Sequence, residues 1–229
     1  PRRMNILVIA AHPDDEVLGC GGAIARLATE GHAVSILILG EGSTARADDP
    51  TKANARERNA LHATAQRVGK FLGAKEVLLS KFPDNRFDTI PLLTLTKVVE
   101  EQIARLHPTV VYTQHGGDLN VDHARTFRSV LTATRPMEED SVKKILAFEV
   151  GSSTEWAFQQ FEPVFRPSVF VDIGATLEKK IEAMTMYRSE ARPFPHPRSG
   201  EAIRANAHRW GSSVGLRAAE AFSLVWSRE

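Results

Sequence analysis

The segment AAHPDDE, residues 10–16, constrains the fold of this chain most, because it places one imidazole and three carboxylates within five positions. A continuous apolar run, residues 5–11 (NILVIAA), leads into it, and a helix-like run follows it. Short continuous apolar runs are typical of buried parallel strands. Open α/β sheets carry their ligand sites at the carboxyl ends of such strands. The sequence therefore predicts a buried strand that ends in a polar functional cluster.

Two interpretations of this cluster are open. Carboxylates so close together repel one another unless a cation or a proton lies between them. His12 and Asp15 can converge on one metal ion through an imidazole nitrogen and a carboxylate oxygen, which zinc accepts as ligands. Asp14 then points elsewhere and is free to take a proton from a metal-bound water. Alternatively, Asp14 or Asp15 caps a helix start by accepting backbone N–H groups. A third ligand elsewhere in the chain would favour the metal site.

Length, charge and cysteine content narrow the class of protein. A chain of 229 residues is long enough for one large α/β domain, which we expect to span residues 1–229. The net charge of +1 provides no basic field for nucleic acid. The single cysteine, Cys20, excludes an internal disulfide and fits a reducing cytoplasm. No membrane-spanning apolar stretch or signal peptide is evident, so a cytoplasmic protein is predicted.

The order of the predicted elements indicates a mostly parallel sheet. Strand-like runs and helical runs alternate as far as about residue 135. The predicted strands of this part are residues 5–11, 33–39, 76–79 and 109–113, and the main helices are 52–68, 91–106 and 124–134. Loops are expected at 41–50 and 82–88. The last third, about 137–229, is predicted to cap the sheet and the pocket, with strands at 144–150, 168–173 and 221–226 and helices at 177–187 and 202–210.

A second polar cluster follows the strand at residues 109–113. It is the segment HGGDLNVDH, residues 115–123. If the first and fourth strands are neighbours, their carboxyl ends lie together, and His123 can complete a set with His12 and Asp15. Two histidines, one carboxylate and an open water position make up catalytic zinc sites. A lone His123 would more often be a helix cap or a packed side chain.

The two clusters together resemble the metal motifs of the PIG-L/LmbE-like zinc deacetylases. The matching residues are AHPDDE at 11–16 and NVDH at 120–123, and the likeness extends over most of the chain, including the segment 192–199. These enzymes remove an acetyl group from N-acetylglucosamine units joined to a lipid, a thiol precursor, a nucleotide or an antibiotic. The resemblance implies a Rossmann-like three-layer sandwich and a small-molecule N-acetylated sugar conjugate as substrate.

The resemblance also implies a role for each matched position. His12, Asp15 and His123 would hold one Zn²⁺ per chain, and Asp14 would be the general base. The hypothesis is metal-assisted amide hydrolysis, in which zinc lowers the pKa of its bound water and that water attacks the acetyl carbonyl. The products would be acetate and a free amine.

Substrate binding is expected from three further side chains. Arg56 would hydrogen-bond sugar hydroxyls, and Asp84 or Arg86 would line the same pocket. By itself, Arg56 would be interpreted as a solvated surface arginine.

One position departs from the family pattern. Many members carry a histidine three positions before the last metal ligand, where this chain has Asn120. An asparagine amide can donate a hydrogen bond to an oxyanion but cannot carry a proton. The proton for the departing amine must then come from Asp14 or from another histidine. His115 and His196 are the candidates, since His196 lies in a loop that could fold over the site.

Other functions are compatible with parts of this pattern. The same site could serve an amidase that acts on a non-sugar N-acyl compound or a thiol conjugate. A Rossmann-like module that binds a sugar or nucleotide without catalysis would need no metal. A purely structural zinc is disfavoured, because such sites are sulfur-rich and Cys20 is the only thiol. Apolar residues near the C-terminus, such as Trp226, could serve a homo-oligomer, and the sequence leaves the oligomeric state open.

Overall fold

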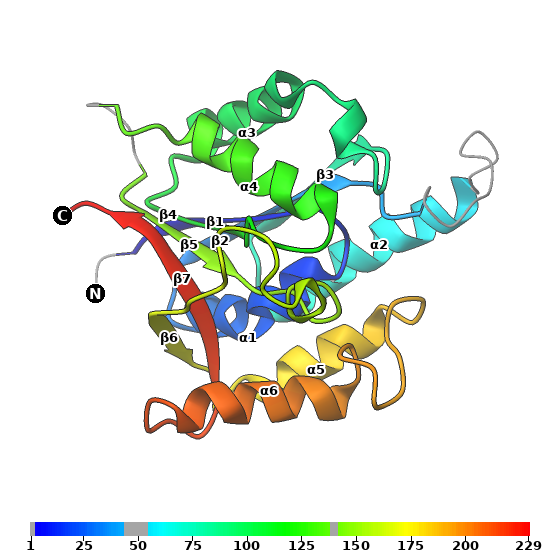
Figure 1. Cartoon of the computed structure of the whole chain (residues 1–229), viewed down its shortest axis with the longest axis vertical. Coiled ribbons are helices and arrows are strands. Elements are labelled where there is room, and N and C mark those ends of the chain that lie inside the picture. Colours follow the sequence, from blue (N-terminus) through cyan, green and yellow to red (C-terminus); the bar gives the residue numbers. More distant parts are fainter. Residues whose placement is uncertain (1–2, 44–54, 138–141) are drawn as a thin grey trace.

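A single mostly parallel sheet forms the centre of the computed structural model, which describes residues 3–43, 55–137 and 142–229. Most of the predicted loop 41–50 and the start of the predicted helix 52–68 lie outside the described residues. Within them, seven strands form one sheet in the order β3-β2-β1-β4-β5-β7-β6 (Figure 1). The strands are β1 (Asn5–Ala10), β2 (Ala33–Gly40), β3 (Glu76–Phe82), β4 (Val110–Gln114), β5 (Lys144–Phe148), β6 (Val169–Asp172) and β7 (Ala219–Ser227).

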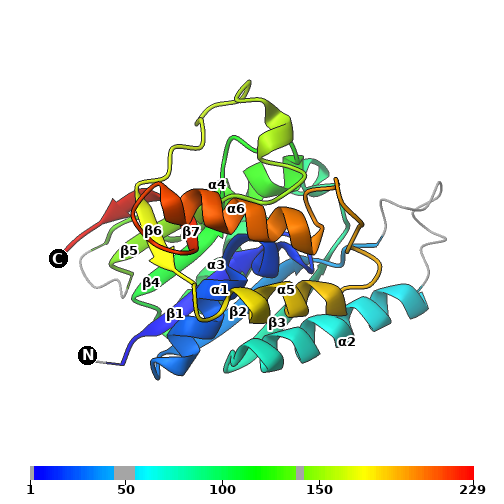
Figure 2. The ribbon, with the colours of Figure 1, turned by 90° about the horizontal axis from the view of Figure 1, so that it is seen from below.

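Helices cover both faces of this sheet. They are α1 (Asp15–Thr29), α2 (Ala55–Leu72), α3 (Leu92–Leu106), α4 (Val121–Ala133), α5 (Leu177–Met186) and α6 (Gly200–Ser212). Figures 1 and 2 show α3 and α4 on one face and α1, α2, α5 and α6 on the other. The predicted Rossmann-like three-layer sandwich is confirmed.

The apolar runs in the sequence are explained by this two-sided cover. All of β2 is buried, and so is β1 from its second residue onward. Side chains alternate between the two faces of a strand, so Ile6 and Val8 pack into the core beneath α1, whereas Leu7 and Ile9 pack into the core beneath α4. A strand buried on both faces reads as a continuous apolar run.

The pairing of β1 with β4 positions the functional site. These strands are parallel, with Ile6 opposite Val110 and Ile9 opposite Thr113, as the prediction of neighbouring strands required. Within the sheet, β2 is the neighbour of β1 on one side and β4 is its neighbour on the other side. Such a point, where strand order reverses, opens a crevice at the carboxyl ends of the strands. The polar segments that follow β1 and β4 meet in this crevice.

The last third of the chain was expected to cap the sheet, and it also extends it. It supplies β5, β7 and β6, and β7 runs antiparallel to both of its neighbours. The carboxylate of Glu220 in β7 accepts hydrogen bonds from the backbone N–H groups of Gly22 (2.9 Å) and Ala23 (2.7 Å), next to a kink of α1 at Cys20. β7 therefore caps the second half of α1, while Lys180 of α5 neutralises Glu220 at 2.7 Å.

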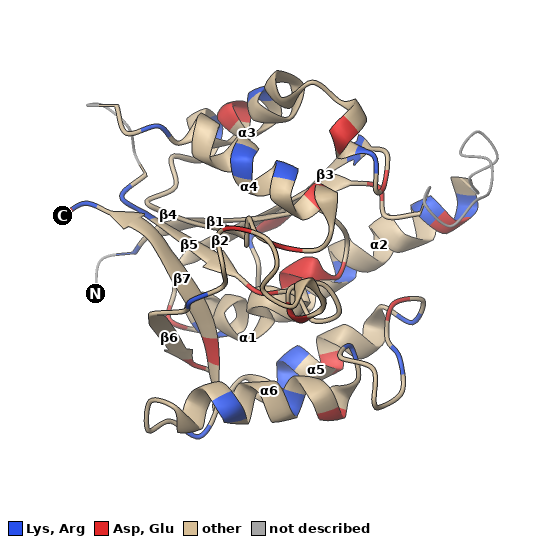
Figure 3. Ribbon diagram, viewed as in Figure 1, with Lys and Arg blue, Asp and Glu red and all other residues tan. Residues whose placement is uncertain are grey.

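Charge is distributed without a dominant sign. Basic and acidic residues are interspersed along the outer helices α3, α5 and α6 (Figure 3). The formal net charge of the whole chain is +1. None of the helices in the described part of the chain combines the length and the apolar character needed to cross a bilayer.

One glycine allows α1 to approach the sheet closely. A Cβ atom at Gly19 would overlap the ring of Phe148, at the end of β5. We expect Gly19→Ala to lower the free energy of unfolding by about 1–3 kcal/mol, because the phenyl ring must shift in a packed core. Gly21→Ala is the matched control, since a Cβ atom there would lie 3.3 Å from Lys180 and from Val17, which is a tight contact rather than an overlap. Urea unfolding measures both, and equal stability of the two variants would contradict this packing argument.

Candidate active site

The three predicted metal ligands lie together at the carboxyl edge of the sheet. His12 follows β1, Asp15 begins α1, and His123 lies in the first turn of α4. Atom Oδ2 of Asp15 lies 3.4 Å from Nδ1 of His12 and 3.4 Å from Nε2 of His123. The ligand atoms of the three residues all lie within 4.8 Å of one another. His12, Asp15 and His123 therefore form a candidate site for one cation.

The ring nitrogens that face away from this site contact other carboxylates. Nε2 of His12 is hydrogen-bonded to Oδ2 of Asp122 at 2.9 Å and lies 3.1 Å from Oδ1 of Asp84. Nδ1 of His123 lies 3.2 Å from Oδ2 of Asp118. A carboxylate on the far nitrogen of a ligating imidazole fixes the ring and increases its basicity. Each imidazole thus presents its other nitrogen to the shared site.

Neutral N–H donors hold the buried carboxylates in place. Asp122 accepts hydrogen bonds from the backbone N–H groups of Asn85 (2.6 Å) and Phe87 (2.8 Å). Asp15 accepts a hydrogen bond of 2.7 Å from Nε2 of Gln114, the last residue of β4. Because these donors carry no charge, they satisfy the carboxylates without neutralising them. The negative charge of the cluster remains available to a cation.

The pKa values reflect this accumulation of carboxylates. Burial by itself lowers the pKa of His12, but hydrogen bonds to Asp122 and Asp15 outweigh it and raise that pKa well above its ordinary value. Burial opposes the rise at His123 too, yet the charges of Asp15 and Asp118 raise its pKa to about 9. The cluster therefore stabilises positive charge, and a metal ion would displace the protons from the two imidazoles.

Asp14 is held apart from the ligand set. Its backbone is left-handed, with φ 106°, a conformation that is strained in residues other than glycine. Its Oδ2 atom accepts a 2.9 Å hydrogen bond from Nη1 of Arg198, which also contacts Glu190 at 3.2 Å and donates through Nε to Ser152 at 2.9 Å. Burial raises the pKa of Asp14 well above its ordinary value, although the charge of Arg198 opposes the shift. This carboxylate is thus placed to hold a proton beside the site.

A cavity of about 200 Å³ opens beside these groups. Its lining includes the predicted site residues His12, Asp14, Asp84, Asn120 and His123. Asn120 also caps α4, since its Oδ1 accepts a 2.9 Å hydrogen bond from the backbone N–H of Asp122. Its Nδ2 donates to Oδ1 of Asn85 at 2.9 Å, which leaves one amide hydrogen. The structure therefore brings both predicted clusters to one cavity.

Other predicted residues lie outside the described lining of this cavity. Arg56 is exposed in the first turn of α2, and Arg86 is exposed in the loop after β3. The ring of His196 stacks edge-on against Trp156, with ring centroids 5.5 Å apart. His115 is buried and lines a different cavity. The roles given to Arg56, Arg86 and His196 therefore stay predictions.

Several residues of the site were not predicted from the sequence. Asp118 and Asp122 belong to the segment 115–123, so their carboxylates near His123 in the sequence could have been predicted to be part of the site. Gln114 is the residue directly before that segment. Arg198 lies two positions after His196, but nothing local indicates that it reaches Asp14, which is 184 positions away. The contacts of Arg198 depend on the fold of the last third.

The comparisons with known proteins agree with this geometry. The family model described as PIG-L, GlcNAc-PI de-N-acetylase, matches residues 7–134. That match covers more than half of the chain and contains both motifs. The chain belongs to the PIG-L family.

Relatives of this PIG-L protein include proteins named as deacetylases. The "Uncharacterized deacetylase YaiS" of Escherichia coli is 29% identical over 185 residues, which is 78% of this chain and 92% of the relative. The "Probable N-acetyl-alpha-D-glucosaminyl L-malate deacetylase 2" of Bacillus cereus is 24% identical over 196 residues, 81% of this chain and 83% of that protein. The crystal structure of the conserved protein TT1542 from Thermus thermophilus aligns with TM-score 0.75 and 26% identity, covering 99% of this chain and 96% of that one.

The candidate site of this PIG-L protein has a donor set that zinc accepts. Two imidazole nitrogens and one carboxylate oxygen are typical of a catalytic zinc site, in which a fourth position stays open. The adjoining cavity provides that position with space. The carboxylates behind both imidazoles complete the arrangement that such ligands usually have. The residues present therefore fit the metal.

We predict that Asp118→Asn weakens zinc binding about 10- to 100-fold, since the amide no longer orients and polarises His123 as a carboxylate does. Competition with a chromophoric chelator measures the affinity. Asp88→Asn is the control, because Asp88 is exposed at the end of the loop after β3. Equal affinities in the two variants would show that Asp118 does not support the metal site.

Proposed function

We propose that this protein is a zinc-dependent deacetylase that hydrolyses the acetamide of an N-acetylglucosamine-type conjugate. The observation that carries this proposal is the cluster of His12, Asp15 and His123 next to a cavity that His12, His123 and Asp14 line, with Asp14 outside the ligand set. A bound zinc ion supplies Lewis acidity and lowers the pKa of a water molecule. The relative from Bacillus cereus, whose name specifies an N-acetyl-glucosaminyl compound, supports a sugar substrate.

Asp14 acts as the general base in this proposal. Arg198 fixes one carboxylate oxygen of Asp14 at 2.9 Å, which leaves the other oxygen to take a proton from the attacking water. Asp14 returns that proton to the sugar nitrogen as the carbon–nitrogen bond breaks, so that the nitrogen leaves as a neutral amine. The reaction then consumes one water and releases acetate and a free amine. Asp14 carries the proton in both directions because Asn120 cannot do so.

The remaining groups of the cavity bind and orient the substrate. The second amide hydrogen of Asn120 donates to the acetyl oxygen as negative charge develops there, and one such donor contributes about 3–4 kcal/mol. Asp84 accepts a hydrogen bond from a sugar hydroxyl, and Arg56 and Arg86 contact the more distant parts of the conjugate. His196 is the second candidate for protonating the amine.

The base assignment has a direct test. Asp14→Asn should bind zinc normally, because Asp14 is not a ligand, yet kcat should fall about 10²- to 10⁴-fold as proton transfer is lost. His123→Ala should lose zinc affinity as well as activity. Acetate release and zinc content are measured on the same samples. Full activity of zinc-loaded Asp14→Asn would refute the role of Asp14.

Removal of the metal tests its role in the proposed reaction. Chelator treatment should abolish acetate release, and added zinc should restore it, since the proposed Lewis acid is then replaced.

Among N-acetylated compounds, sugar, nucleotide-sugar and thiol-sugar acetamides should react faster than acyl compounds without a sugar. Equal rates across the panel would instead indicate a general amidase. Sugar binding without acetate release from the metal-loaded protein would indicate a binding module.

A further inference from the structure

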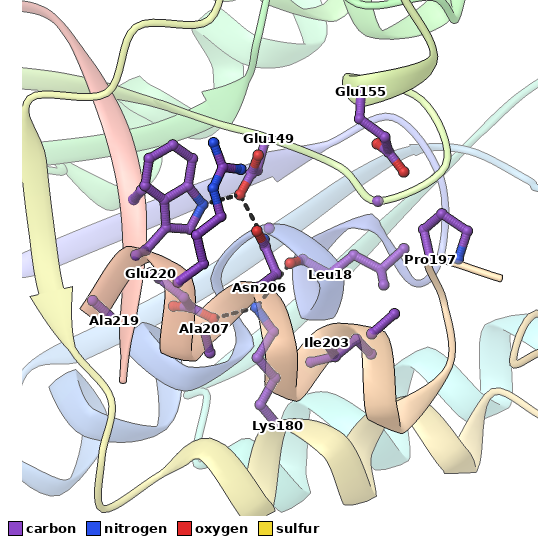
Figure 4. Close-up of a pocket in the computed structure, with 16 residues that line it drawn as sticks. Leu18, Glu149, Glu155, Lys180, Pro197, Ile203, Asn206, Ala207, Ala219 and Glu220 are labelled. Carbon is purple, nitrogen blue, oxygen red and sulfur yellow. Dashed lines mark hydrogen bonds and ion pairs between the residues drawn. The ribbon is translucent and has the colours of Figure 1, made fainter. Parts of the chain in front are cut away.

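A second cavity, of about 250 Å³, lies between α6, the part of α1 near its kink and the segment that follows β5 (Figure 4). One side is a face of α6 that carries Ala202, Asn206 and Trp210, which are spaced four residues apart along the helix. The opposite parts are Leu18 near the kink of α1 and Glu149 directly after β5. The catalytic residues proposed above do not include any of these side chains.

Open hydrogen-bond acceptors face this second cavity. Oε1 of Glu149 accepts hydrogen bonds from Nδ2 of Asn206 at 2.7 Å and from Nε1 of Trp210 at 2.5 Å. Among the described residues, Oε2 of Glu149 and Oδ1 of Asn206 have no hydrogen-bond partner. Glu155, across the cavity, accepts a hydrogen bond from the backbone N–H of Ser152 through Oε1 at 2.6 Å.

A buried donor lies at the floor of the same cavity. Nζ of Lys180 donates to Oε1 of Glu220 at 2.7 Å and to the backbone carbonyl of Leu18 at 2.8 Å. An ammonium has three N–H groups, so one remains for a ligand. Glu220 neutralises the charge of Lys180, and the lysine side chain is only 7% exposed. The floor therefore offers a fixed hydrogen-bond donor without excess positive charge.

Apolar side chains complete the lining. Leu18, Ile203 and Pro197 provide a hydrocarbon surface, and the indole of Trp210 is fixed by Glu149. Small-molecule sites combine such surfaces with a few convergent polar atoms. The volume corresponds to roughly eight water molecules at about 30 Å³ each, which suits one small ring and excludes a large ligand.

We propose that this second cavity binds a single sugar ring through its hydroxyl groups. A hydroxyl can donate to Glu149 or Asn206 and accept from Lys180, so one ligand type satisfies both kinds of open atom. The carboxylates of Glu149 and Glu155 disfavour an anion, and the one further cation among the described lining residues, Arg209, lies over the Trp210 ring at 4.4 Å from its centroid. A purely apolar ligand would bury the open oxygens without partners. The C–H face of a sugar ring also suits the apolar wall formed by Leu18 and its neighbours.

Only a thin partition separates this cavity from the metal site. Gly151 and Pro197 line the second cavity, whereas Ser152 and Arg198, the residues that follow them, line the metal cavity. Nε of Arg198 donates to Oγ of Ser152 at 2.9 Å and joins the two segments. The sugar could be a free monosaccharide or a neighbouring ring of a longer saccharide, and these sources share the same chemistry.

The test is calorimetric titration of the zinc-loaded full-length chain with glucose and, separately, with cellobiose. Neither sugar contains an acetamide, so turnover does not interfere. Ala202→Leu fills the cavity from α6, and Ala205→Leu is its matched control on the exposed side of the same helix. Asn206→Ala removes one polar contact and serves if Ala202→Leu does not fold. We expect saturable binding of glucose to the parent and to Ala205→Leu, and at least tenfold weaker binding to Ala202→Leu and Asn206→Ala.

Absence of saturable binding of both sugars to the parent chain would overturn the proposal. So would unchanged binding in both cavity variants, because the sugar would then occupy another site. Cellobiose binding more tightly than glucose would assign the site to a ring of a longer saccharide, and equal affinities would assign it to a free monosaccharide. Since no acetyl transfer is measured, failure of this experiment is independent of failure of the proposed deacetylase activity.

Discussion

One carboxylate oxygen, Oδ2 of Asp15, connects the two parts of the site. It lies 3.4 Å from an imidazole nitrogen of His12, at the end of β1, and 3.4 Å from one of His123, at the start of α4. It also accepts a hydrogen bond from Gln114 at the end of β4. The arrangement depends on the parallel pairing of β1 with β4, which brings segments about a hundred residues apart to one edge of the sheet. Loss of that pairing would separate the imidazoles.

The surroundings of the site make a cation favourable there. Burying several carboxylates in one region is costly unless positive charge accompanies them. Asp118 and Asp122 stand behind the two imidazoles, and neutral N–H groups orient Asp122 without cancelling its charge. Asp14 is the exception, because Arg198 pairs with it directly. This pairing distinguishes Asp14 from its neighbour Asp15, which contacts the two imidazoles, although the two carboxylates are adjacent in the chain.

Much of this site could be predicted from the sequence because its key parts are local. The apolar runs before His12 and His115 indicated buried strands, and the polar residues after each run indicated the edge at which they end. The contacts of Arg198 with Asp14 could not be predicted, since they depend on how the last third folds back over 184 positions. The position of β7 between β5 and β6 could not be predicted either. Hydrophobic periodicity indicates which residues are buried, but it does not give the order of the strands in a sheet.

The second cavity could not be predicted from the sequence either. Its polar atoms come from α5, α6, β7 and the segment that follows β5, and each of these residues by itself resembles an ordinary surface or core position. They come together only where α5, α6 and β7 fold against α1 and the segment that follows β5. The central claim nevertheless concerns the metal, and X-ray absorption at the zinc edge of protein loaded with one equivalent tests it most directly. The account predicts imidazole scattering and light N/O ligands at about 2.0–2.2 Å. A sulfur shell at about 2.3 Å, or a shell without imidazole, would contradict it.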